Sequence, residues 1–410
     1  MISSQIPVCI IGAGPGGATT SIFLSKKKIP HIIVDKDTFP RDKICGDGLD
    51  LKVLRVLKQI DPNITPETIF GSQPFSKSWG MRFITPSGLY KNFIFKPKSD
   101  EPAHPLFCVS KRFNFDQFLV DKLDKTYAEV HLGTKATKIE RKNGGIEVTF
   151  EKEGQIYKTF CNLIVGADGD HSVVLRELDE RKIDRKHYAA GLRQYWKNVS
   201  GIHEDKLIEV YFKKEYPCGY FWIFPLPNNE FNVGFGMVSE IISGKKVNLQ
   251  TCMRDIIEND KVMAPRFKNA TALESMRGWG LPLASRRKKA FGDNYLLVGD
   301  ASSSINPMTG EGIGTAMVSG VVAANFVEKA MINQRFTEDV FKNYDRELYR
   351  RLEPEIKQYN RIFAWKLEYW LNGIYEFIFR LPLTQWYSSK MYKVWINTAL
   401  NKPIEVNMHD

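Results

Sequence analysis

Cysteine is scarce in this sequence, and its placement excludes the common cysteine-built sites. The chain has 410 residues and six widely spaced cysteines. None of them forms a Cys-x-x-Cys pair or stands at zinc-ligand spacing from a histidine, so we expect no metal. So sparse a set suits the reduced thiols of a cytoplasm. The N-terminus also lacks the layout of a signal peptide, and we expect a cytoplasmic protein.

Long apolar runs and one-sided charge clusters are lacking too. The charge-free stretch at 313–327 is too short and too rich in small residues to predict a membrane span. The net charge of +11 comes from lysines and arginines scattered along the chain, without a nucleic-acid-binding motif. We therefore expect no nucleic-acid partner. The basic balance leaves open a peripheral contact with the anionic inner face of a membrane, or an anionic substrate.

What the sequence does contain is a glycine-rich turn between a strand and a helix. Residues 6–11 form an apolar, β-branched run that predicts a buried parallel strand, residues 14–28 predict a helix, and a second strand at 31–34 ends at Asp35. Glycines let the backbone approach a pyrophosphate at a helix N-terminus, and Asp35 can accept ribose hydroxyls. We interpret this βαβ unit as dinucleotide-binding rather than as an ordinary glycine-rich turn. The residues of its G-x-G-x-x-G turn are Gly12, Ala13, Gly14, Pro15, Gly16 and Gly17.

Two further turns carry an aspartate directly after a short apolar strand. These strands are predicted at 162–165 and 295–298, far from the first unit along the chain. We expect distant parts of the sequence to contribute to one sheet. Taken singly, each Asp-Gly or Gly-Asp pair predicts only a turn. The turn residues are Asp168, Gly169, Gly299 and Asp300.

Two other segments indicate the reacting side of the site. A loop at 41–49 follows the second strand and holds a lysine and a cysteine among glycines. A strand predicted at 220–225 places three aromatic side chains on one face, since alternate residues of a strand point the same way. Such a face can form an apolar wall for a polyene or prenyl chain, or simply pack against a helix. The three aromatic residues are Tyr220, Trp222 and Phe224.

Together these motifs resemble the glutathione-reductase-type flavoproteins, and in particular the geranylgeranyl reductase family, which is related to class A hydroxylases and flavin halogenases. The resemblance rests on Lys-x-Cys-Gly-x-Gly at 43–48, Arg-x-x-Phe-Asp at 112–116, Tyr-x-Trp-x-Phe-Pro at 220–225 and Val-Gly-x-Gly at 233–236. It covers roughly residues 5–330. One position departs from the family pattern, because Leu226 stands where a lysine is common after the proline.

The resemblance implies FAD as the cofactor. In these families the second Gly-Asp turn places its carboxylate on the ribityl chain, the Asp-Gly pair braces the pyrophosphate region, and the arginine lies near the phosphates. We also expect the helix that starts after the 306–314 loop to direct backbone N–H groups at the pyrimidine edge of the flavin. The expected cofactor-binding residues are Gly12, Gly14, Pro15, Gly16, Gly17, Asp35, Lys36, Arg41, Cys45, Gly46, Arg112, Asp168, Gly169, Gly299, Asp300, Gly310, Gly312 and Ile313.

The same resemblance places Cys45 beside the flavin ring, with Lys43 supplying positive charge. These two are our candidate catalytic residues. Cationic neighbours favour the thiolate form of a cysteine, whereas a buried structural thiol is the alternative. The expected substrate-binding residues are Tyr220, Trp222, Phe224 and Pro307.

The predicted architecture is α/β, with a discontinuous Rossmann-type FAD-binding domain, a mixed β-sheet substrate domain and a helical C-terminal cap. We assign residues 1–70, 105–180 and 275–335 to the first, 71–104 and 181–274 to the second, and 336–410 to the cap. Aromatic and basic residues of the cap could form a lid over a hydrophobic tunnel or lie on a membrane. The residues concerned are Arg361, Trp365, Lys366, Trp370, Arg380, Trp386, Lys390, Lys393 and Trp395.

The sequence therefore predicts an FAD-dependent oxidoreductase that reduces C=C bonds of a polyprenyl lipid or quinone by hydride transfer. A flavin-dependent monooxygenase or halogenase remains an alternative, as does a non-catalytic prenyl-lipid or FAD-binding module at a membrane. The sequence has no second strand, G-x-G-x-x-G and helix unit, since Gly234-x-Gly236 lacks the third glycine. We therefore expect the reductant, NAD(P)H or ferredoxin, to dock transiently.

Overall fold

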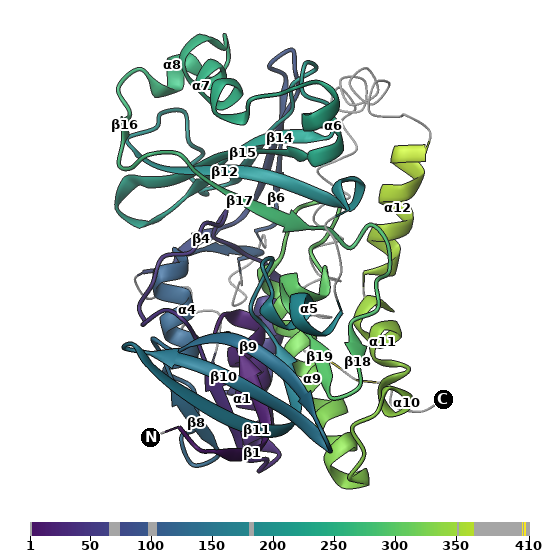
Figure 1. Ribbon diagram of the computed structural model, residues 1–410. Coiled ribbons are helices and arrows are strands. Elements are labelled where there is room, and N and C mark those ends of the chain that lie inside the picture. Colours follow the sequence, from purple (N-terminus) through teal and green to yellow (C-terminus); the bar gives the residue numbers. More distant parts are fainter. Residues whose placement is uncertain are drawn as a thin grey trace.

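Two large β-sheets stand at opposite ends of the molecule, each with its own helices (Figure 1). This computed structural model describes residues 2–64, 74–96, 105–179, 184–350, 352–364, 404 and 406. The lower body in Figure 1 combines one sheet with long helices, and the upper body combines a strongly bent sheet with short helices. The predicted α/β class with two sheet domains and C-terminal helices is confirmed.

The first sheet is built from segments that are far apart in the chain. Its order is β18-β19-β11-β1-β2-β8, and β1 pairs in parallel with both β11 and β2. Val8 lies opposite Leu163 on one side and His31 on the other, so the strands before the predicted turns are neighbours. β9 and β10 extend β11 as an antiparallel meander. The strands are β1 (Gln5–Ile11), β2 (His31–Val34), β8 (Ala128–His131), β9 (Lys135–Lys142), β10 (Gly145–Lys152), β11 (Gln155–Gly166), β18 (Phe291–Gly292) and β19 (Tyr295–Leu297).

Two helices, α1 (Pro15–Lys26) and α9 (Ile313–Asn333), pack closely beside this sheet. A Cβ atom at Gly320 of α9 would lie 2.6 Å from the carbonyl oxygen of Gly16, so only glycine permits this approach. The charge-free segment 313–327 is extended by six residues, including Glu328 and Lys329, into a helix of 21 residues, which is long and apolar enough to cross a membrane by length and composition alone. However, 72% of its apolar window is buried inside the protein, as is typical of a core helix.

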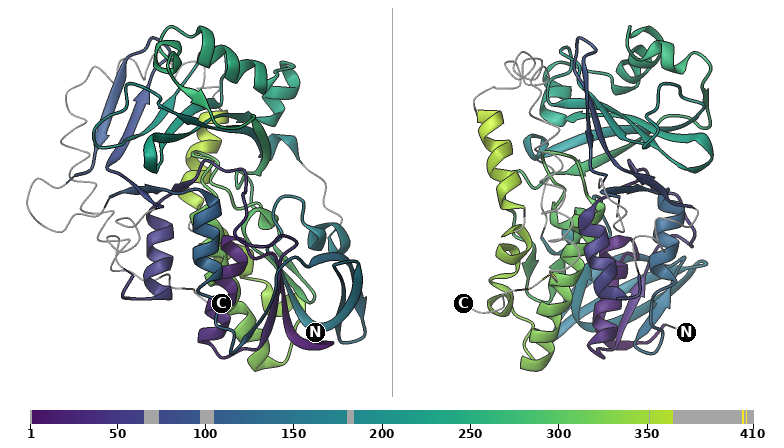
Figure 2. Two further views of the ribbon diagram at one scale, coloured as in Figure 1. Left: turned by 90° about the vertical axis from the view of Figure 1, so that its left-hand side faces the viewer. Right: turned by 180° about the vertical axis from the view of Figure 1, so that it is seen from behind.

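The second sheet carries the predicted aromatic strand near its centre. Its order is β16-β12-β15-β14-β13-β5-β6, with β17 also pairing β12. All pairs are antiparallel except β13 with β5, so the sheet is mixed as predicted. Helices α6, α7 and α8 lie at the far end, away from the first sheet (Figures 1 and 2). The elements are β5 (Gly80–Ile84), β6 (Tyr90–Ile94), β12 (Tyr188–Lys197), β13 (Ile208–Tyr211), β14 (Gly219–Pro225), β15 (Glu230–Val238), β16 (Thr271–Ala272), β17 (Arg277–Pro282), α6 (Ser239–Gly244), α7 (Leu249–Asn259) and α8 (Ala264–Phe267).

A small three-stranded sheet lies between the two bodies. It has the order β3-β7-β4 and joins the end of the 41–49 loop to the strand that precedes helix α4. Helix α2 follows directly, capped by Asp50, whose carboxylate accepts from the backbone N–H groups of Lys52 and Val53. The elements are β3 (Gly48–Leu49), β4 (Ser76–Ser78), β7 (Phe107–Val109), α2 (Leu51–Ile60) and α4 (Arg112–Val120).

Two predicted domain boundaries need correction. β17 pairs with β12 in the second sheet, so that domain extends to Pro282 rather than ending at 274. β4 pairs with β7, so residues 76–78 belong to the small sheet instead of the substrate sheet. Beyond α9, the described part of the cap is helical, in α10 (Glu338–Phe341), α11 (Tyr344–Arg350) and α12 (Glu353–Ala364). Apart from Arg361, the basic and aromatic cap residues predicted as a lid or membrane face lie outside the described residues.

Candidate active site

The glycine-rich turn lies where β1 ends and α1 begins. Gly12 has φ +102°, and a Cβ atom there would lie 2.4 Å from the carbonyl oxygen of Ala167. Gly14 is the N-cap of α1 without a side-chain cap, and Pro15 opens the helix. The first turn of α1 therefore presents uncapped backbone N–H groups and the positive end of its dipole, which is the geometry that binds a phosphate.

Two arginines flank this helix start, of which Arg112 is buried and Arg41 is partly buried. A Cβ atom at Gly14 would lie 3.6 Å from Nη2 of Arg41 and 3.9 Å from Nη2 of Arg112. Both are held by Asp116, a carboxylate with no exposed surface. Arg112 donates to it through Nε at 2.5 Å and Nη2 at 2.7 Å, and Arg41 forms an ion pair with it at 3.0 Å. The pair of guanidinium groups adds fixed positive charge where a pyrophosphate would lie.

Asp35 lies at the end of β2, beside the same turn. Its Oδ2 accepts from the N–H of Ala13 at 2.7 Å and its Oδ1 from the N–H of Asp37 at 2.9 Å. Burial raises the pKa of this carboxyl, while the charge of Arg41 opposes that rise. Each oxygen keeps a lone pair that a ribose hydroxyl could use. Lys36, predicted as a cofactor contact, is exposed beside it.

The Asp168 turn packs against the glycine-rich turn. Oδ2 of Asp168 accepts from the N–H groups of Val173 and Val174, at 2.6 and 3.3 Å, and so anchors helix α5 (Val173–Leu178). Its Oδ1 is buried and has no hydrogen-bond partner among the described residues. Gly169 has φ +78° and open space where a Cβ atom would be. A buried acceptor without a partner is expected where a bound molecule supplies the donor.

Asp300 lies next to the start of α9, in one of the turns that the motifs predicted to come together in the fold. It follows Gly299, which has φ +59°, and a Cβ atom at Gly312 would lie 3.7 Å from its Oδ1. Burial raises the pKa of Asp300, and the positive charges of Lys43 and Arg112 oppose that rise. The turn at 299–302 thus brings a carboxyl between two cations and the N-terminus of α9.

The start of α9 differs from what the sequence suggested. Glu311 accepts from the backbone N–H groups of Gly314 and Thr315, at 2.5 and 3.3 Å. Its other oxygen pairs with Lys52 at 3.1 Å. The expectation that the N–H groups of this helix start face the flavin is therefore wrong for these two positions, because a carboxylate already caps them.

The 41–49 loop packs directly against the aromatic strand. A Cβ atom at Gly46 would lie 3.4 Å from Cε2 of Phe224 and 3.9 Å from Nε1 of Trp222, and one at Gly48 would lie 3.5 Å from Phe224. Trp222 lies between the other two aromatic rings of its face, with centroids 5.8 Å from Tyr220 and 6.2 Å from Phe224. Two separately predicted segments thus form one surface.

The aromatic strand also reaches the loop before α9. The hydroxyl of Tyr220 donates to the carbonyl oxygen of Thr309 at 2.6 Å, and a Cβ atom at Gly310 would lie 3.1 Å from the same hydroxyl. Pro307, in that loop, is buried. The predicted substrate wall therefore borders the predicted flavin loops on two sides, at residues 46–48 and 309–310.

Cys45 and Lys43 lie where the 41–49 loop meets the aromatic strand, a region that we call the junction. Burial shifts the pKa of each side chain. Burial raises the pKa of the Cys45 thiol despite the opposing charge of Arg112. Of the two alternatives drawn from the sequence, the direction of this shift favours a buried neutral thiol over the thiolate. Burial lowers the pKa of Lys43 to about 8, and its Nζ lies 3.0 Å from the ring centroid of Trp279.

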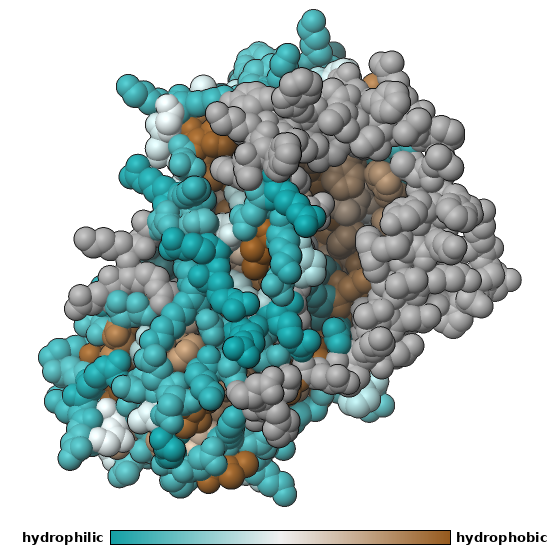
Figure 3. Space-filling view, turned by 90° about the vertical axis from the view of Figure 1, so that its right-hand side faces the viewer, coloured by the Kyte–Doolittle hydropathy of each residue, from teal (hydrophilic) through white to brown (hydrophobic). Residues whose placement is uncertain are grey.

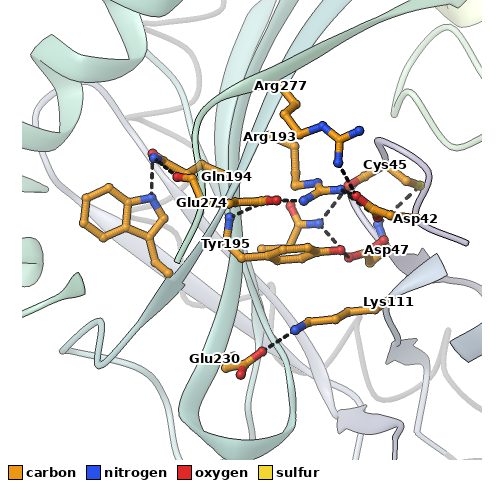
Figure 4. A network of polar contacts seen from close by, with 12 residues as sticks. Asp42, Cys45, Asp47, Lys111, Arg193, Gln194, Tyr195, Glu230, Glu274 and Arg277 are labelled. Atoms are coloured by element: carbon orange, nitrogen blue, oxygen red, sulfur yellow. Dashed lines mark hydrogen bonds and ion pairs between the residues drawn. The ribbon is translucent and has the colours of Figure 1, made fainter. Parts of the chain in front are cut away.

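Several residues of the junction were missed from the sequence. Asp47 accepts hydrogen bonds from Tyr195 and Asn232, and Arg193 donates to both oxygens of Asp42 (Figure 4). Asp47 lies inside a motif that the sequence pointed to, so only its burial was unforeseen. Arg193 lies on β12 and is 1% exposed, and no sequence pattern identified it.

These residues fit FAD. The uncapped helix start, the two arginines and the partnerless Oδ1 of Asp168 are the features that a pyrophosphate and its neighbouring groups require. The described residues contain no group of three or more His, Cys, Asp or Glu side chains that could hold a metal ion. The turns, arginines and carboxylates described above are those of a site for an organic dinucleotide.

Comparisons with known proteins agree with this geometry. Digeranylgeranylglycerophospholipid reductase 3 of Methanosphaera stadtmanae is 28% identical over 361 residues, which cover 87% of this chain and 85% of that protein. The solved structure of a geranylgeranyl bacteriochlorophyll reductase-like protein from Thermoplasma acidophilum superposes with a TM-score of 0.73 at 20% identity, covering 98% of this chain and 94% of that one. A flavin-dependent brominase has the same fold, with a TM-score of 0.72 at 17% identity and coverage of 96% and 98%.

The resemblance to geranylgeranyl reductases that the motifs suggested is thus confirmed. The model of the FAD binding domain family matches residues 5–347, which include every turn described above. This chain belongs to the FAD binding domain family.

Proposed function

We propose that this protein reduces carbon–carbon double bonds of a polyprenyl lipid with electrons held on FAD. Bound reduced FAD supplies a hydride, and the chain supplies orientation, a dry surface and a proton. The observation that carries the proposal is the packing of the Cys45 loop on the Tyr220, Trp222 and Phe224 face. An apolar wall that continues into the flavin-binding turns suits a long hydrocarbon substrate.

Each part of the site has a distinct task in this proposal. Arg41 and Arg112 hold the pyrophosphate, and Asp35 and Asp300 orient the sugar and ribityl hydroxyls. The aromatic face binds the prenyl chain largely through buried area. Cys45, as a neutral thiol, is suited to give a proton to the carbon that does not receive the hydride. Relatives named digeranylgeranylglycerophospholipid reductase support a lipid of the geranylgeranyl class as the substrate.

An anaerobic assay with three arms tests this function. The flavin-loaded protein is reduced with dithionite and mixed with a digeranylgeranyl glycerophospholipid, with the lipid and oxygen, or with the lipid, oxygen and bromide. Mass spectrometry of the lipid should show stepwise gain of hydrogen in the first arm. Hydroxylated or brominated lipid formed only with oxygen, and no hydrogen gain without it, would contradict the reductase and favour a monooxygenase or halogenase.

We further propose that the reductant, NAD(P)H or ferredoxin, binds only transiently. The single dinucleotide motif supports this proposal, because FAD would occupy it.

We also propose a location in the cytoplasm with peripheral contact at the inner face of the membrane. Figure 3 shows hydrophobic residues gathered in a hollow of the face on the α12 side of the molecule, which supports such a contact. Co-sedimentation with anionic vesicles, weakening as salt rises, tests the contact. Binding that is absent at low salt would contradict it.

A further inference from the structure

Asp47 is a fully buried carboxyl at the junction of the two bodies. It follows Cys45 and Gly46 in the loop and lies beside Tyr195 of strand β12 (Figure 4). Its φ of +65° is left-handed, a conformation that aspartate tolerates better than most residues. The Ser110 N–H, which donates to its carbonyl oxygen at 3.1 Å, helps to hold it there. The side chain therefore has a fixed direction into the protein.

The two oxygens of this carboxyl have unequal surroundings. Oδ2 accepts from the Tyr195 hydroxyl at 2.7 Å and from Nδ2 of Asn232 at 2.8 Å. Oδ1 is buried without a hydrogen-bond partner among the described residues. Both donors to Oδ2 are neutral, so no cation forms an ion pair with Asp47 within the described part of the chain. A carboxyl held in this way can exist as the acid.

Burial raises the pKa of Asp47 to about 6, and four neighbours oppose that rise. The titratable and charged groups facing it come from three elements. From β12 these are Arg193 and Tyr195, from α4 it is Arg112, and from its own loop it is Cys45. Lys111 lies behind, over the ring of Tyr195 at 4.7 Å. The proton on Asp47 is therefore exchanged close to neutral pH.

Hydrogen bonds join Asp47 to the thiol and to the aromatic wall. The N–H of Asp47 donates to Sγ of Cys45 at 3.3 Å. Nδ2 of Asn232 also donates to the carbonyl oxygen of Cys45 at 2.7 Å, while its Oδ1 accepts from Nε1 of Trp222 at 2.9 Å. The backbone N–H of Asp47 thus contacts the thiol directly, whereas its carboxyl is joined through Asn232 to the Cys45 backbone and to the substrate wall. In addition, the charge of Asp47 raises the pKa of Cys45.

We propose that Asp47 holds the proton which saturating a double bond consumes, and delivers it through Cys45. The inference rests on the proposed function. The hydride from bound reduced FAD adds to one alkene carbon, and the proton of Cys45 Sγ–H adds to the other, so the thiol becomes a thiolate. The carboxylic proton of Asp47 then restores the thiol and leaves a carboxylate. Solvent reprotonates Asp47, and an external two-electron donor restores the flavin. Asp47 acts through Cys45 and is a positioning residue for the proton.

The first test measures the thiol without any turnover. Flavin-loaded protein is alkylated with iodoacetamide across a pH series, and modification of Cys45 is read by peptide-resolved mass spectrometry. Asp47→Asn should lower the pH midpoint of Cys45 alkylation by about one unit, since a nearby negative charge is removed. The matched control is Asp260→Asn, because Asp260 also accepts from a tyrosine, Tyr211, and ends helix α7, which lies at the far end of the second sheet (Figure 1). An unchanged midpoint in Asp47→Asn would overturn the coupling.

The second test measures steady-state lipid reduction against pH, with dithionite in excess so that Cys45 must be reprotonated in every cycle. The wild-type rate should fall as pH rises through the pKa of Asp47, and Asp47→Asn should be slower by about a hundredfold with that limb lost and KM little changed. If Asp47→Asn does not fold, Tyr195→Phe serves instead. Loss of the Tyr195 hydrogen bond disfavours the carboxylate, so this variant should move the limb to higher pH. A limb that persists in Asp47→Asn, or that stays in place or moves down in Tyr195→Phe, would overturn the proton role.

The outcomes separate this inference from the proposed function. Wild-type protein that reduces no lipid at any pH would refute the function, and the alkylation series would still decide whether Asp47 and Cys45 are coupled. Normal lipid reduction with a pH profile that ignores Asp47→Asn would refute only the proton role.

Discussion

Two buried carboxyls of the candidate site, Asp116 and Asp47, have very different partners. Asp116 is held by two arginines, through short charged contacts. Asp47 is held by a tyrosine and an asparagine, both neutral. A carboxyl paired with two guanidinium groups fixes its partners in place through charge-assisted hydrogen bonds. One paired with neutral donors in a buried place can gain and lose a proton. The first arrangement suits holding a cofactor, and the second suits chemistry.

The largest expected effect comes from removing Arg112, the arginine that contacts Asp116 most closely. Arg112→Ala leaves Asp116 without its two closest contacts and should destabilise the protein by about 3–5 kcal/mol, with loss of bound flavin. Flavin absorbance of the purified protein and its Tm measure both effects. Lys122→Ala is the control, since it removes an exposed pair with Asp61 at 3.8 Å. Equal flavin content in the two variants would show that Arg112 does not hold the cofactor.

The second-largest effect is a difference in how the free energy of unfolding depends on pH. Because the native state binds the proton of Asp47 more tightly than the unfolded chain does, wild-type stability falls as pH rises from about 4 to about 6. Relative to Asp47→Asn, the wild type should lose about 2 kcal/mol over this window, as measured by urea unfolding. Asp260 has a lowered pKa, so the advantage of wild type over Asp260→Asn should instead shrink as pH falls. Parallel curves for wild type and Asp47→Asn would contradict the raised pKa.

A smaller effect is expected at the aromatic face. Phe224→Ala removes a ring next to Gly46 and Gly48 and should raise KM for a geranylgeranyl lipid about tenfold, through lost apolar contact. Flavin binding should be unaffected. Phe83→Ala, on β5 of the same sheet, is the matched control because its ring stacks on Phe212 elsewhere. If both variants raise KM equally, the face is a packing surface and not a substrate wall.

The smallest effect concerns the link between the Cys45 loop and the second sheet. Arg193 donates to both oxygens of Asp42, at 3.0 Å each, and also pairs with Glu274. Asp42→Asn should destabilise the protein by only about 1 kcal/mol, because Asp42 is partly exposed and Glu274 remains. Urea unfolding measures this. If Asp42→Asn destabilised the protein as much as Arg112→Ala does, the contact of the Cys45 loop with Arg193 would contribute as much to stability as the contact of Arg112 with Asp116, contrary to this prediction.

The sequence revealed the cofactor end better than the reacting end, for a physical reason. Gly12, Gly14 and Asp35 depend on local requirements, namely a positive φ, close backbone approach and a strand end, and these leave a pattern in consecutive residues. The strands that carry them are short and apolar, and the structure confirms those predicted at 6–11 and 31–34.

The Asp47 network depends instead on sheet register across long separations. Tyr195 and Asn232 are 148 and 185 residues from Asp47, and their positions follow from the pairing of β12 with β15. No local propensity encodes that pairing. The capping role of Glu311 was missed for a related reason, because the glycines around it also fit a helix start that is open to a ligand. The paired segments 43–48 and 220–225 were both found, but their contact was visible only in the fold.

Single turnover in heavy water tests the central claim most directly. Flavin-loaded protein is reduced anaerobically in D₂O, mixed with a digeranylgeranyl glycerophospholipid, and followed by flavin absorbance and by mass spectrometry of the lipid. The flavin should reoxidise together with saturation of the lipid, and each saturated bond should gain two deuterium atoms, one as hydride and one as the proton relayed by the chain. Flavin that stays reduced until oxygen is admitted, with no deuterium in the lipid, would contradict the account.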